Sequence, residues 1–236
     1  MSSLDVFERV MRLAARYADG KIAVSRARAD HLSSEDVEVI PSGLDLEVFR
    51  PMDKRECREQ LGLPQDKKLV LFAASTVHNP RKRLELAREA VELLKRETDA
   101  ELVIATKVTH AEIAMYMSAC DALVLTSMHE GSPNVVKEAI ACDLPVVSVD
   151  VGDTRERIAL AGAGAICGDT PAELAAGLGK VLAAGPVTTR ESILELDERR
   201  TTRRVIGMYH RVVQQQKASA KMRDLGGEDN YSVRRA

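Results

Sequence analysis

Residues 122–149 read ALVLTSMHEGSPNVVKEAIACDLPVVSV. The apolar runs at the two ends, ALVL and VVSV, have the length and composition of buried strands. A loop that contains Gly131 follows the first run, and a helical pattern separates it from the second. This order of strand, loop, helix and strand is typical of a parallel sheet whose faces are covered by helices.

The start of the helix in this stretch predicts an anion site. Ser132 is predicted as the N-cap and Pro133 as the first residue of a helix over 134–141. The first N–H groups of a helix lack partners within it, and the helix dipole favours negative charge there. Two carboxylates, Glu130 before the helix and Glu138 inside it, would repel a phosphate, so we expect them to bind sugar hydroxyls instead.

The same alternation extends over the middle of the chain and predicts an α/β fold with a doubly wound, Rossmann-like parallel sheet. The further strands are expected at 69–74, 102–105 and 165–167, and the further helices at 82–97, 109–120, 155–160 and 170–182. Ligands of such sheets bind beyond the carboxyl ends of the strands, where Glu130 lies. Asp53 is predicted to cap a helix that ends at Gly62, and capping boxes are predicted at Thr109 and Thr170.

The two ends of the chain have a different pattern. Residues 4–17 predict an amphipathic helix, followed by short strands at 22–24 and 37–40 with a short helix, 27–32, between them. Residues 190–216 predict a final helix with an apolar stripe, and the polar segment 218–236 is predicted to be disordered. Arg9, Arg12 and Arg16 leave a membrane-surface role for the first helix open, although acidic neighbours dilute their charge.

Composition excludes several classes of protein. The 236 residues carry a net charge of −2, only 3% of them are aromatic and none is Trp, so neither bulk charge nor stacking surface indicates nucleic-acid binding. No apolar run approaches the roughly 20 residues that span a bilayer. The cysteines are scattered without metal-ligand spacing and are expected to be small buried hydrophobes in a reducing cytosol: Cys57, Cys120, Cys142 and Cys167.

A second candidate site is the basic run Pro80-Arg81-Lys82-Arg83 at the predicted start of a helix. Cations at a helix N-terminus oppose the dipole, so an anion that compensates them would be favourable. A solvated surface patch is the alternative.

The string from Glu130 to Ala139, followed by Asp143-Leu144-Pro145-Val146-Val147, closely resembles a family signature. It is that of the retaining nucleotide-sugar glycosyltransferases of GT-B architecture, the group 1 family, in which Glu-x7-Glu precedes Gly-x-Pro-Val-Val. The chain looks most similar to the enzymes of cell-surface polysaccharide and teichuronic acid synthesis. Asp143 stands where the family usually has Gly, near the helix end and away from the site.

The resemblance implies a role for each matched residue. Glu130 would bind hydroxyls of the donor sugar and serve catalysis, whereas Glu138 would accept hydrogen bonds from the ribose hydroxyls of the nucleotide. Backbone N–H groups at Asn134, Val135 and Val136 would face the sugar and the diphosphate, and Gly131 is included in the predicted substrate-binding set.

The basic run matches the family in part. Lys82 matches a lysine that binds the donor diphosphate and would serve catalysis. The accompanying arginine position falls on Thr76, so Arg81 or Arg83 is a candidate substitute. Val108 matches a loop whose backbone contacts the nucleobase, with plain packing of its side chain as the alternative. His129 as a general base and Ser132 as a nucleophile are disfavoured; the family's active-site histidine lies in its other domain, and Ser132 lacks a nucleophile elbow.

The resemblance also implies a domain organisation. Residues 1–35 would be a remnant of the acceptor-binding domain with the hinge, and 36–186 the Rossmann-like donor domain. Residues 187–217 would form a helix that crosses back to the acceptor-binding domain, and 218–236 a tail. We therefore expect an N-terminally truncated polypeptide whose exposed apolar stripes favour self-association or a separate N-terminal-half chain.

The sequence thus predicts a hexosyltransferase-type donor domain that takes a nucleoside-diphosphate sugar, uses no metal or other cofactor, and is cytoplasmic or peripheral to the inner face of the membrane. Activity of this chain alone is left open. A catalytically silent nucleotide-sugar binding module and a nucleotide-sugar epimerase-like protein are the alternatives, of which the Glu-x7-Glu string disfavours the epimerase.

Overall fold

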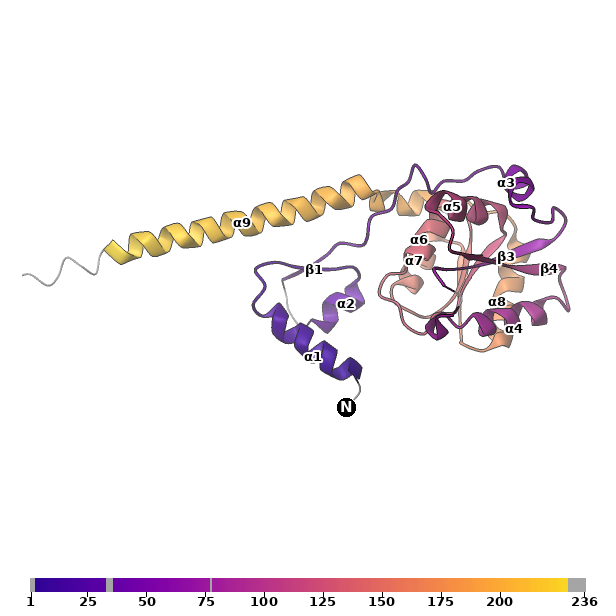
Figure 1. Cartoon of the computed structure of the whole chain (residues 1–236), viewed down its shortest axis with the longest axis horizontal. Coiled ribbons are helices and arrows are strands. Elements are labelled where there is room, and N and C mark those ends of the chain that lie inside the picture. The colour runs from indigo at the N-terminus through magenta and orange to yellow at the C-terminus, as the bar shows by residue number, and fades with distance from the viewer. Residues whose placement is uncertain (1–2, 33–35, 77, 229–236) are drawn as a thin grey trace, which may run out of the picture.

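The computed structural model describes residues 3–32, 36–76 and 78–228, and its main body is an α/β domain (Figure 1). Its sheet is parallel, in the order β4 (Ala100–Thr106), β3 (Lys68–Ala74), β5 (Ala122–Leu125), β6 (Val146–Val149) and β7 (Gly164–Cys167). Because β3 comes first in the chain yet lies between β4 and β5, the winding direction reverses between β3 and β5. The doubly wound, Rossmann-like fold predicted from the sequence is confirmed.

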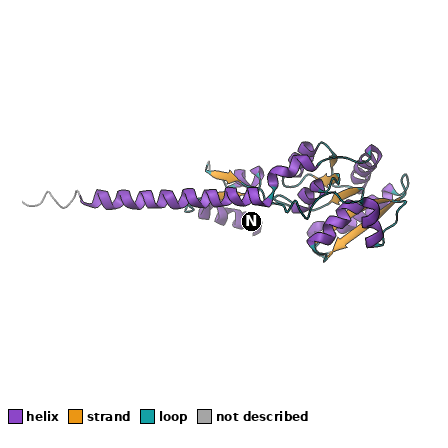
Figure 2. Cartoon of the chain, turned by 90° about the horizontal axis from the view of Figure 1, so that it is seen from above, coloured by secondary structure: helices purple, strands orange, loops and turns teal. Residues whose placement is uncertain are grey.

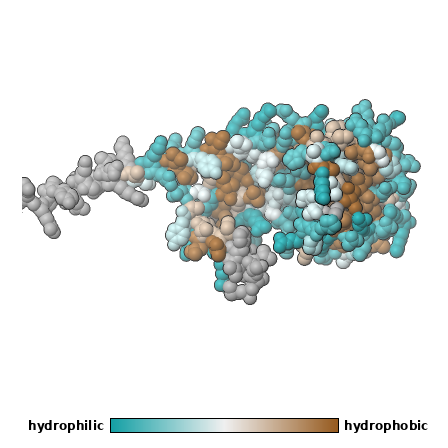
Figure 3. All heavy atoms as spheres, viewed as in Figure 1, coloured by the Kyte–Doolittle hydropathy of each residue, from teal (hydrophilic) through white to brown (hydrophobic). Residues whose placement is uncertain are grey.

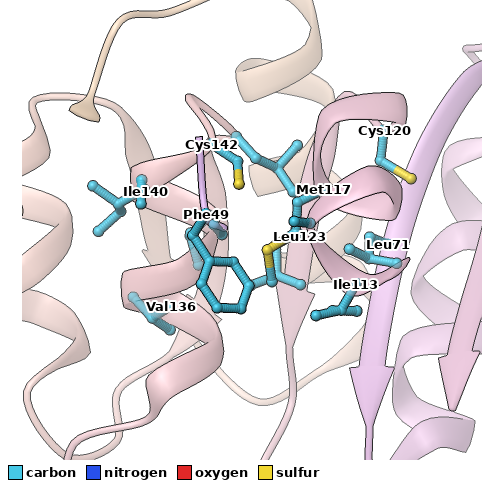
Figure 4. Close-up of a cluster of buried hydrophobic side chains, with 14 of the residues drawn as sticks. Phe49, Leu71, Ile113, Met117, Cys120, Leu123, Val136, Ile140 and Cys142 are labelled. Atoms are coloured by element: carbon cyan, nitrogen blue, oxygen red, sulfur yellow. The ribbon is translucent and has the colours of Figure 1, made fainter. Parts of the chain in front are cut away.

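Helices cover both faces of this sheet. One face carries α4 (Leu84–Leu94) and α8 (Pro171–Ala184); the other carries α5 (His110–Ala119), α6 (Asn134–Ala141) and α7 (Thr154–Ala161), with α3 (Lys54–Leu61) packed on α5. Successive residues of β3 point to opposite faces, so Leu71 joins the apolar cluster under α5 and α6, whereas Phe72 joins the cluster under α4 and α8. Figure 4 shows the first cluster around the ring of Phe49.

Most helix ends follow the predicted capping residues. Asp53 accepts a hydrogen bond from the Glu56 N–H, and Gly62 ends α3 in the left-handed conformation. Thr109 and Glu112 form the predicted capping box of α5, and the Thr170 side chain caps α8.

The cysteines of the described chain are free thiols, and Cys57, Cys120 and Cys142 are buried as predicted. Cys167 is only partly buried. Burial raises the pKa of the Cys142 thiol to about 12.

A second, smaller unit precedes the main sheet. It contains α1 (Ser3–Ala15), β1 (Lys21–Ala23), α2 (Arg26–His31) and β2 (Val37–Val39), with β1 and β2 paired in parallel. The final helix, α9 (Glu198–Glu228), runs alongside this unit and extends beyond it (Figures 1 and 2). A methyl group at Gly20 would lie 2.8 Å from Val212 Cγ2, so the unit and the helix are in close contact.

The chain passes twice between this small unit and the main domain. Leu44 donates its N–H to the Leu196 carbonyl at 2.8 Å, and the Glu198 N–H donates to the Leu44 carbonyl at 3.0 Å. These reciprocal bonds join the segment that leaves β2 to the segment that enters α9. The segment around Leu44, which links the small unit to the main domain, therefore lies beside the start of the final helix.

The predicted helix over 190–216 is wrong at both ends. Residues Arg190–Leu196 form a 3-10 helix, η2, whose Ile193 and Leu196 are buried in the main domain. The chain then turns at Asp197, whose Oδ1 accepts the N–H groups of Arg199 and Arg200 and so starts α9. The apolar pattern continues across this break, which results from the burial of Ile193 and Leu196 together with the cap at Asp197.

Helix α9 also includes residues 218–228, for which the composition predicts disorder. Alanine, lysine, methionine and leucine in this segment are strong helix formers, which low hydrophobicity alone does not reveal. Residues 229–236 of the predicted tail lie outside the described residues. In the described part of the chain, none of the helices has the length and apolar character to cross a bilayer.

Candidate functional site

The loops after β3 and β5 meet where the sheet reverses its winding, which is the ligand-binding position of doubly wound sheets. Lys82 lies at the end of a 3-10 turn, η1 (Pro80–Lys82), and Glu130 lies in the loop after β5. Lys82 Nζ lies 2.7 Å from Glu130 Oε1, and the side chains are 27% and 19% exposed. The structure therefore brings together the two residues predicted as catalytic.

The expectation that the helix starts at Lys82 is wrong. Helix α4 begins at Leu84, because Arg83 adopts a left-handed conformation with φ of 51° and separates η1 from the helix. The cations therefore do not occupy the first turn of an α-helix, and the argument from the dipole does not apply to them. Lys82 and Arg83 instead form side-chain contacts, with Glu130 and with the Thr126 carbonyl.

Arg83 connects the loop after β3 to the loop after β5. Its Nε donates to the Thr126 carbonyl at 2.6 Å, and Thr126 Oγ1 donates to the Lys82 carbonyl at the same distance. Arg83 also pairs with Asp169. Arg81 has an exposed side chain, and its carbonyl accepts the Met128 N–H at 2.9 Å. Of the two candidate substitutes for a second phosphate-binding cation, Arg81 is the one whose side chain faces solvent.

The start of α6 differs from the predicted cap. Pro133 occupies the N-cap position without a side-chain hydrogen bond, and the helix begins at Asn134. Ser132 Oγ does not cap the helix; it donates to Asp153 Oδ2 at 2.8 Å. The predicted roles of Ser132 as N-cap and Pro133 as first helical residue are therefore wrong, because a tertiary contact takes the hydroxyl that the local pattern assigned to the helix.

The first N–H groups of α6 are available for a ligand. The Val136 N–H bonds to the Pro133 carbonyl at 3.2 Å, but no acceptor in the described chain pairs with the N–H groups of Asn134 and Val135. Asn134 is exposed and Val135 half-buried, while Val136 packs in the core. Two of the three predicted amides therefore remain unpaired, and they lie after the loop that carries Glu130.

Glu138 lies one turn further along α6 and is half-buried. Burial raises the pKa of its carboxyl above the usual 4.5, while the nearby His110 and Lys137 act in the opposite direction. No hydrogen bond or ion pair joins this carboxylate to another side chain of the described residues. A partly buried carboxylate without a partner is a suitable acceptor for ligand hydroxyls.

Three other residues considered in the sequence analysis have different surroundings. Val108 packs its side chain against the core cluster of α5 and α6, as the alternative interpretation expects. Thr76 is half-buried and its Oγ1 accepts the His78 N–H at 3.3 Å. His129 is exposed. Within the described chain, no group of three or more His, Cys, Asp or Glu side chains is arranged to hold a metal ion.

The sequence reasoning missed three charged residues around the loop. Lys137 is 1% exposed, and among the described residues its Nζ donates only to the Ser42 carbonyl, at 3.4 Å. Burial lowers the pKa of Lys137. Its place among Val136, Ile140 and other apolar helix positions could have indicated burial. Asp153 had no comparable signal, since its partner Ser132 is 21 residues away in the chain.

The third missed residue, Arg28, comes from the small N-terminal unit. A methyl group at Gly131 would lie 3.3 Å from Arg28 Nε, so helix α2 closely approaches the Glu130–Gly131 loop. The small unit therefore borders the site, which no local pattern in the sequence indicates.

Part of the chain is similar in sequence to known proteins. Residues 106–184, which include Glu130 and Glu138, match the family model described as glycosyl transferases group 1. A Bacillus subtilis protein named as a teichuronic acid biosynthesis glycosyltransferase, TuaC, is 33% identical over 141 residues. The match covers 52% of this chain and 36% of that relative.

Residues 106–184 of the chain are thus similar to the group 1 glycosyltransferases.

Solved structures extend the likeness over the whole fold. Sucrose-phosphate synthase of Thermosynechococcus elongatus superposes with a TM-score of 0.78 at 20% identity, over 89% of this chain and 62% of that one. Alr3699/HepE of Anabaena, solved in complex with UDP, gives 0.68 at 20% identity, over 86% of this chain and 67% of that one. The chain thus shares the GT-B fold of these glycosyltransferase structures over about two thirds of their length. The sequence match covers about a third of the curated relative.

Proposed function

We propose that this chain is the donor-binding domain of a retaining glycosyltransferase that takes a nucleoside-diphosphate sugar. The proposal rests on the groups that lie where the sheet reverses its winding direction, between β3 and β5. A Lys82–Glu130 pair, two unpaired amides at the start of α6 and an unpartnered Glu138 carboxylate follow one another there. Cations and amides suit a diphosphate, and carboxylates suit hydroxyl groups.

Each group would have a defined task. Glu138 would accept from the ribose hydroxyls, and the N–H groups of Asn134 and Val135 would bind the diphosphate. Lys82 would move from Glu130 towards the diphosphate when the donor binds, which leaves Glu130 free for hydroxyls of the sugar. The HepE protein was solved with UDP and with UDP-glucose, which supports a nucleotide sugar as the ligand of this fold.

The proposed chemistry is electrostatic. In a retaining transfer the bond between the anomeric carbon and the diphosphate oxygen breaks as a sugar–acceptor bond forms on the same face. The acceptor hydroxyl passes its proton to the departing diphosphate oxygen. Lys82 and the α6 amides would stabilise the negative charge on the departing diphosphate, and Glu130 would hold the sugar as it gains oxocarbenium character. We propose that no metal ion takes part, because the amides and Lys82 can supply the positive charge that such an ion would.

A catalytically silent nucleotide-sugar binding module is the second candidate. The observation that favours it is the site itself, whose amides and carboxylates suit a bound donor whether or not the sugar is transferred. The matched segment spans 36% of TuaC. The resemblance to TuaC, which is named for teichuronic acid biosynthesis, supports a role in cell-surface polysaccharide synthesis for the whole protein.

Nucleotide binding is the experiment that tests the proposal. The midpoint of thermal unfolding is measured with UDP-, GDP- and ADP-sugars, for the unaltered chain and for Glu138→Ala. A ligand at 100 times its Kd should add about 2.7 kcal/mol to the free energy of unfolding. No shift with any nucleotide contradicts donor binding, and an equal shift in Glu138→Ala contradicts the assignment of the ribose to Glu138.

Turnover separates the enzyme from the silent module. The chain is assayed for release of nucleoside diphosphate, alone and with an N-terminal half of a related glycosyltransferase added. Turnover with the added half supports a transferase, whereas nucleotide binding without turnover in both assays supports the silent module.

A further inference from the structure

Asp153 lies directly behind the donor loop, in the turn between β6 and α7. It is 7% exposed, and its Oδ2 accepts the hydroxyl of Ser132 at 2.8 Å. Ser132 stands between Glu130 and the unpaired amides of α6. The bond therefore reaches the point of the chain where the sugar-binding carboxylate and the diphosphate-binding amides are connected.

The backbone contact beside this bond is equally close. Gly152 has φ of 58°, and a methyl group there would lie 2.8 Å from the Gly131 carbonyl oxygen. Only glycine suits both the left-handed conformation and the close approach. The turn that contains Gly152 and Asp153 therefore presses against Gly131 and Ser132 through both backbone and side chain.

Asp153 is itself held in place by a buried arginine. Arg157 Nε lies 3.4 Å from Asp153 Oδ2, the two side chains being 8% and 6% exposed. Arg157 Nη1 lies 3.1 Å from Glu195 Oε1 in η2. The carboxylate is thus anchored to α7 and to the segment that leads into α9, so its position does not depend on the loop that it contacts.

Stability alone does not account for this carboxylate. Asp153 Oδ1 is buried and no hydrogen-bond partner for it lies among the described residues. A buried carboxylate oxygen without a partner costs stability, and proteins keep such groups mainly where function needs them. In addition, Pro133 at the N-cap of α6 gives the helix no side-chain cap, so the Ser132 bond is what fixes the entry of the chain into the helix.

We propose that Asp153 is a positioning residue: through Ser132 it holds the Glu130–Ser132 loop and the first amides of α6 in the orientation that binds the donor diphosphate. This inference rests on the proposed donor-binding function. It adds a residue from outside the Glu-x7-Glu segment to the machinery that prepares the site for the ligand. Asp153 acts before the ligand arrives and does not touch it.

Binding of a nucleoside diphosphate tests the inference. The Kd of UDP, GDP and ADP is measured by calorimetry for the unaltered chain, Ser132→Ala, Asp153→Ala, Asp153→Asn and the control Asp150→Asn. Asp150 is an exposed carboxylate three residues earlier that pairs with Arg155. All titrations are made well below the unfolding temperature of each variant, which is recorded separately.

The expected pattern distinguishes positioning from stability. Ser132→Ala and Asp153→Ala should weaken binding of the preferred nucleotide by about five- to tenfold, the effect of one lost hydrogen bond. Asp153→Asn keeps an acceptor oxygen for Ser132 and should recover most of the affinity. Asp150→Asn should bind like the unaltered chain. The unfolding temperature should not track the Kd across this series.

Other results overturn the inference. Unchanged affinity in Ser132→Ala and Asp153→Ala, with a lower unfolding temperature alone, shows a structural role. Equal weakening in Asp150→Asn shows a non-specific charge effect. If Asp153→Ala does not fold, Ser132→Ala carries the test, since Ser132 is only half-buried. An unaltered chain that binds no nucleotide refutes the donor proposal itself, and the positioning role falls with it.

Discussion

The carboxylate of Glu138 should make nucleotide affinity depend on pH. Its raised pKa means that the folded chain holds a proton on Glu138 at pH values where the unfolded chain does not. The ionised form, which accepts hydrogen bonds from the ribose, is therefore lost as the pH falls through a value above 4.5. We predict that nucleotide affinity declines by up to about tenfold per pH unit below that point.

The Glu138→Gln variant isolates this effect. An amide does not titrate, so the variant should bind weakly at neutral pH and should not show the decline in affinity at low pH. Glu138→Gln should also unfold at a higher temperature than the unaltered chain at pH 7, because burial of a charged carboxylate is relieved. This difference should vanish below pH 4.5, where both side chains are neutral. An identical pH profile of affinity in the two proteins would refute the assignment.

Lys82 gives a second prediction for a single residue. Lys82→Gln removes the cation that faces Glu130 and, in our account, the diphosphate. We expect about a tenfold or greater loss of affinity for a nucleoside diphosphate, since hydrogen bonds to charged groups contribute about 1.5–3 kcal/mol, and little change for the nucleoside alone. Lys95, which pairs with Glu92 on the exposed side of α4, provides the matched control Lys95→Gln. Equal losses for nucleoside and nucleotide would show that Lys82 does not act on the phosphates.

At the scale of the elements, local patterns predicted most of the fold. The apolar runs of β3 to β7 and the capping residues of α3, α5 and α8 have signals within a few neighbouring residues. The Glu130–Glu138 spacing likewise sits inside one loop and one helix. These features depend on short-range preferences, which a sequence displays directly.

Most of the failures share one physical cause, the exception being the helix over 218–228, which local helix propensity explains. Ser132 bonds to Asp153 and not to its own helix, Arg83 bonds to Thr126 in another loop, and the break at Asp197 follows the burial of Ile193 and Leu196. In each case a tertiary contact outweighs the local preference. Asp153 and Arg28 escaped prediction for the same reason, because their partners are distant in the chain.

The end of α6 offers a test at this scale. Asp143 stands where the resembling family usually has Gly, and it adopts φ of 57°. Its Oδ1 accepts the N–H groups of Thr189 and Arg190, at 2.7 and 2.9 Å. The aspartate therefore tolerates the strained backbone and also anchors the segment before η2.

Replacement of this aspartate should separate stability from binding. We predict that Asp143→Ala lowers the free energy of unfolding by about 2–3 kcal/mol, because two hydrogen bonds are lost and the strain remains. Asp143→Gly should lose less, since glycine relieves the strain. Nucleotide affinity, measured below the unfolding temperature, should be unchanged in both. Chemical denaturation supplies the free energies, and a loss of affinity would show that this turn reaches the site.

The whole molecule presents apolar side chains that the described chain does not cover. Ile206, Tyr209 and Val213 are 46%, 66% and 47% exposed along one stripe of α9, and Tyr17 in the small unit is 83% exposed. Figure 3 shows apolar surface where the long helix and the small unit meet. Such a surface is typical of an interface.

We predict that the chain self-associates at tens of micromolar through this stripe. Light scattering should give a mass above 25.8 kDa, and Tyr209→Lys with Val213→Glu should return the monomer. Leu160→Ser, at an apolar position that is 56% exposed on α7, should leave the mass unchanged. A monomer for the unaltered chain would contradict the prediction and leave a separate partner chain as the candidate occupant.

The account of the molecule as a nucleotide-sugar binding domain is tested most directly by a crystal structure of the chain with a nucleoside diphosphate. We predict that the ribose hydroxyls lie within hydrogen-bond distance of the Glu138 carboxylate. The diphosphate should lie on the N–H groups of Asn134 and Val135, with Lys82 Nζ turned from Glu130 towards it. A nucleotide bound elsewhere, or bound here with its ribose away from Glu138, would contradict the account.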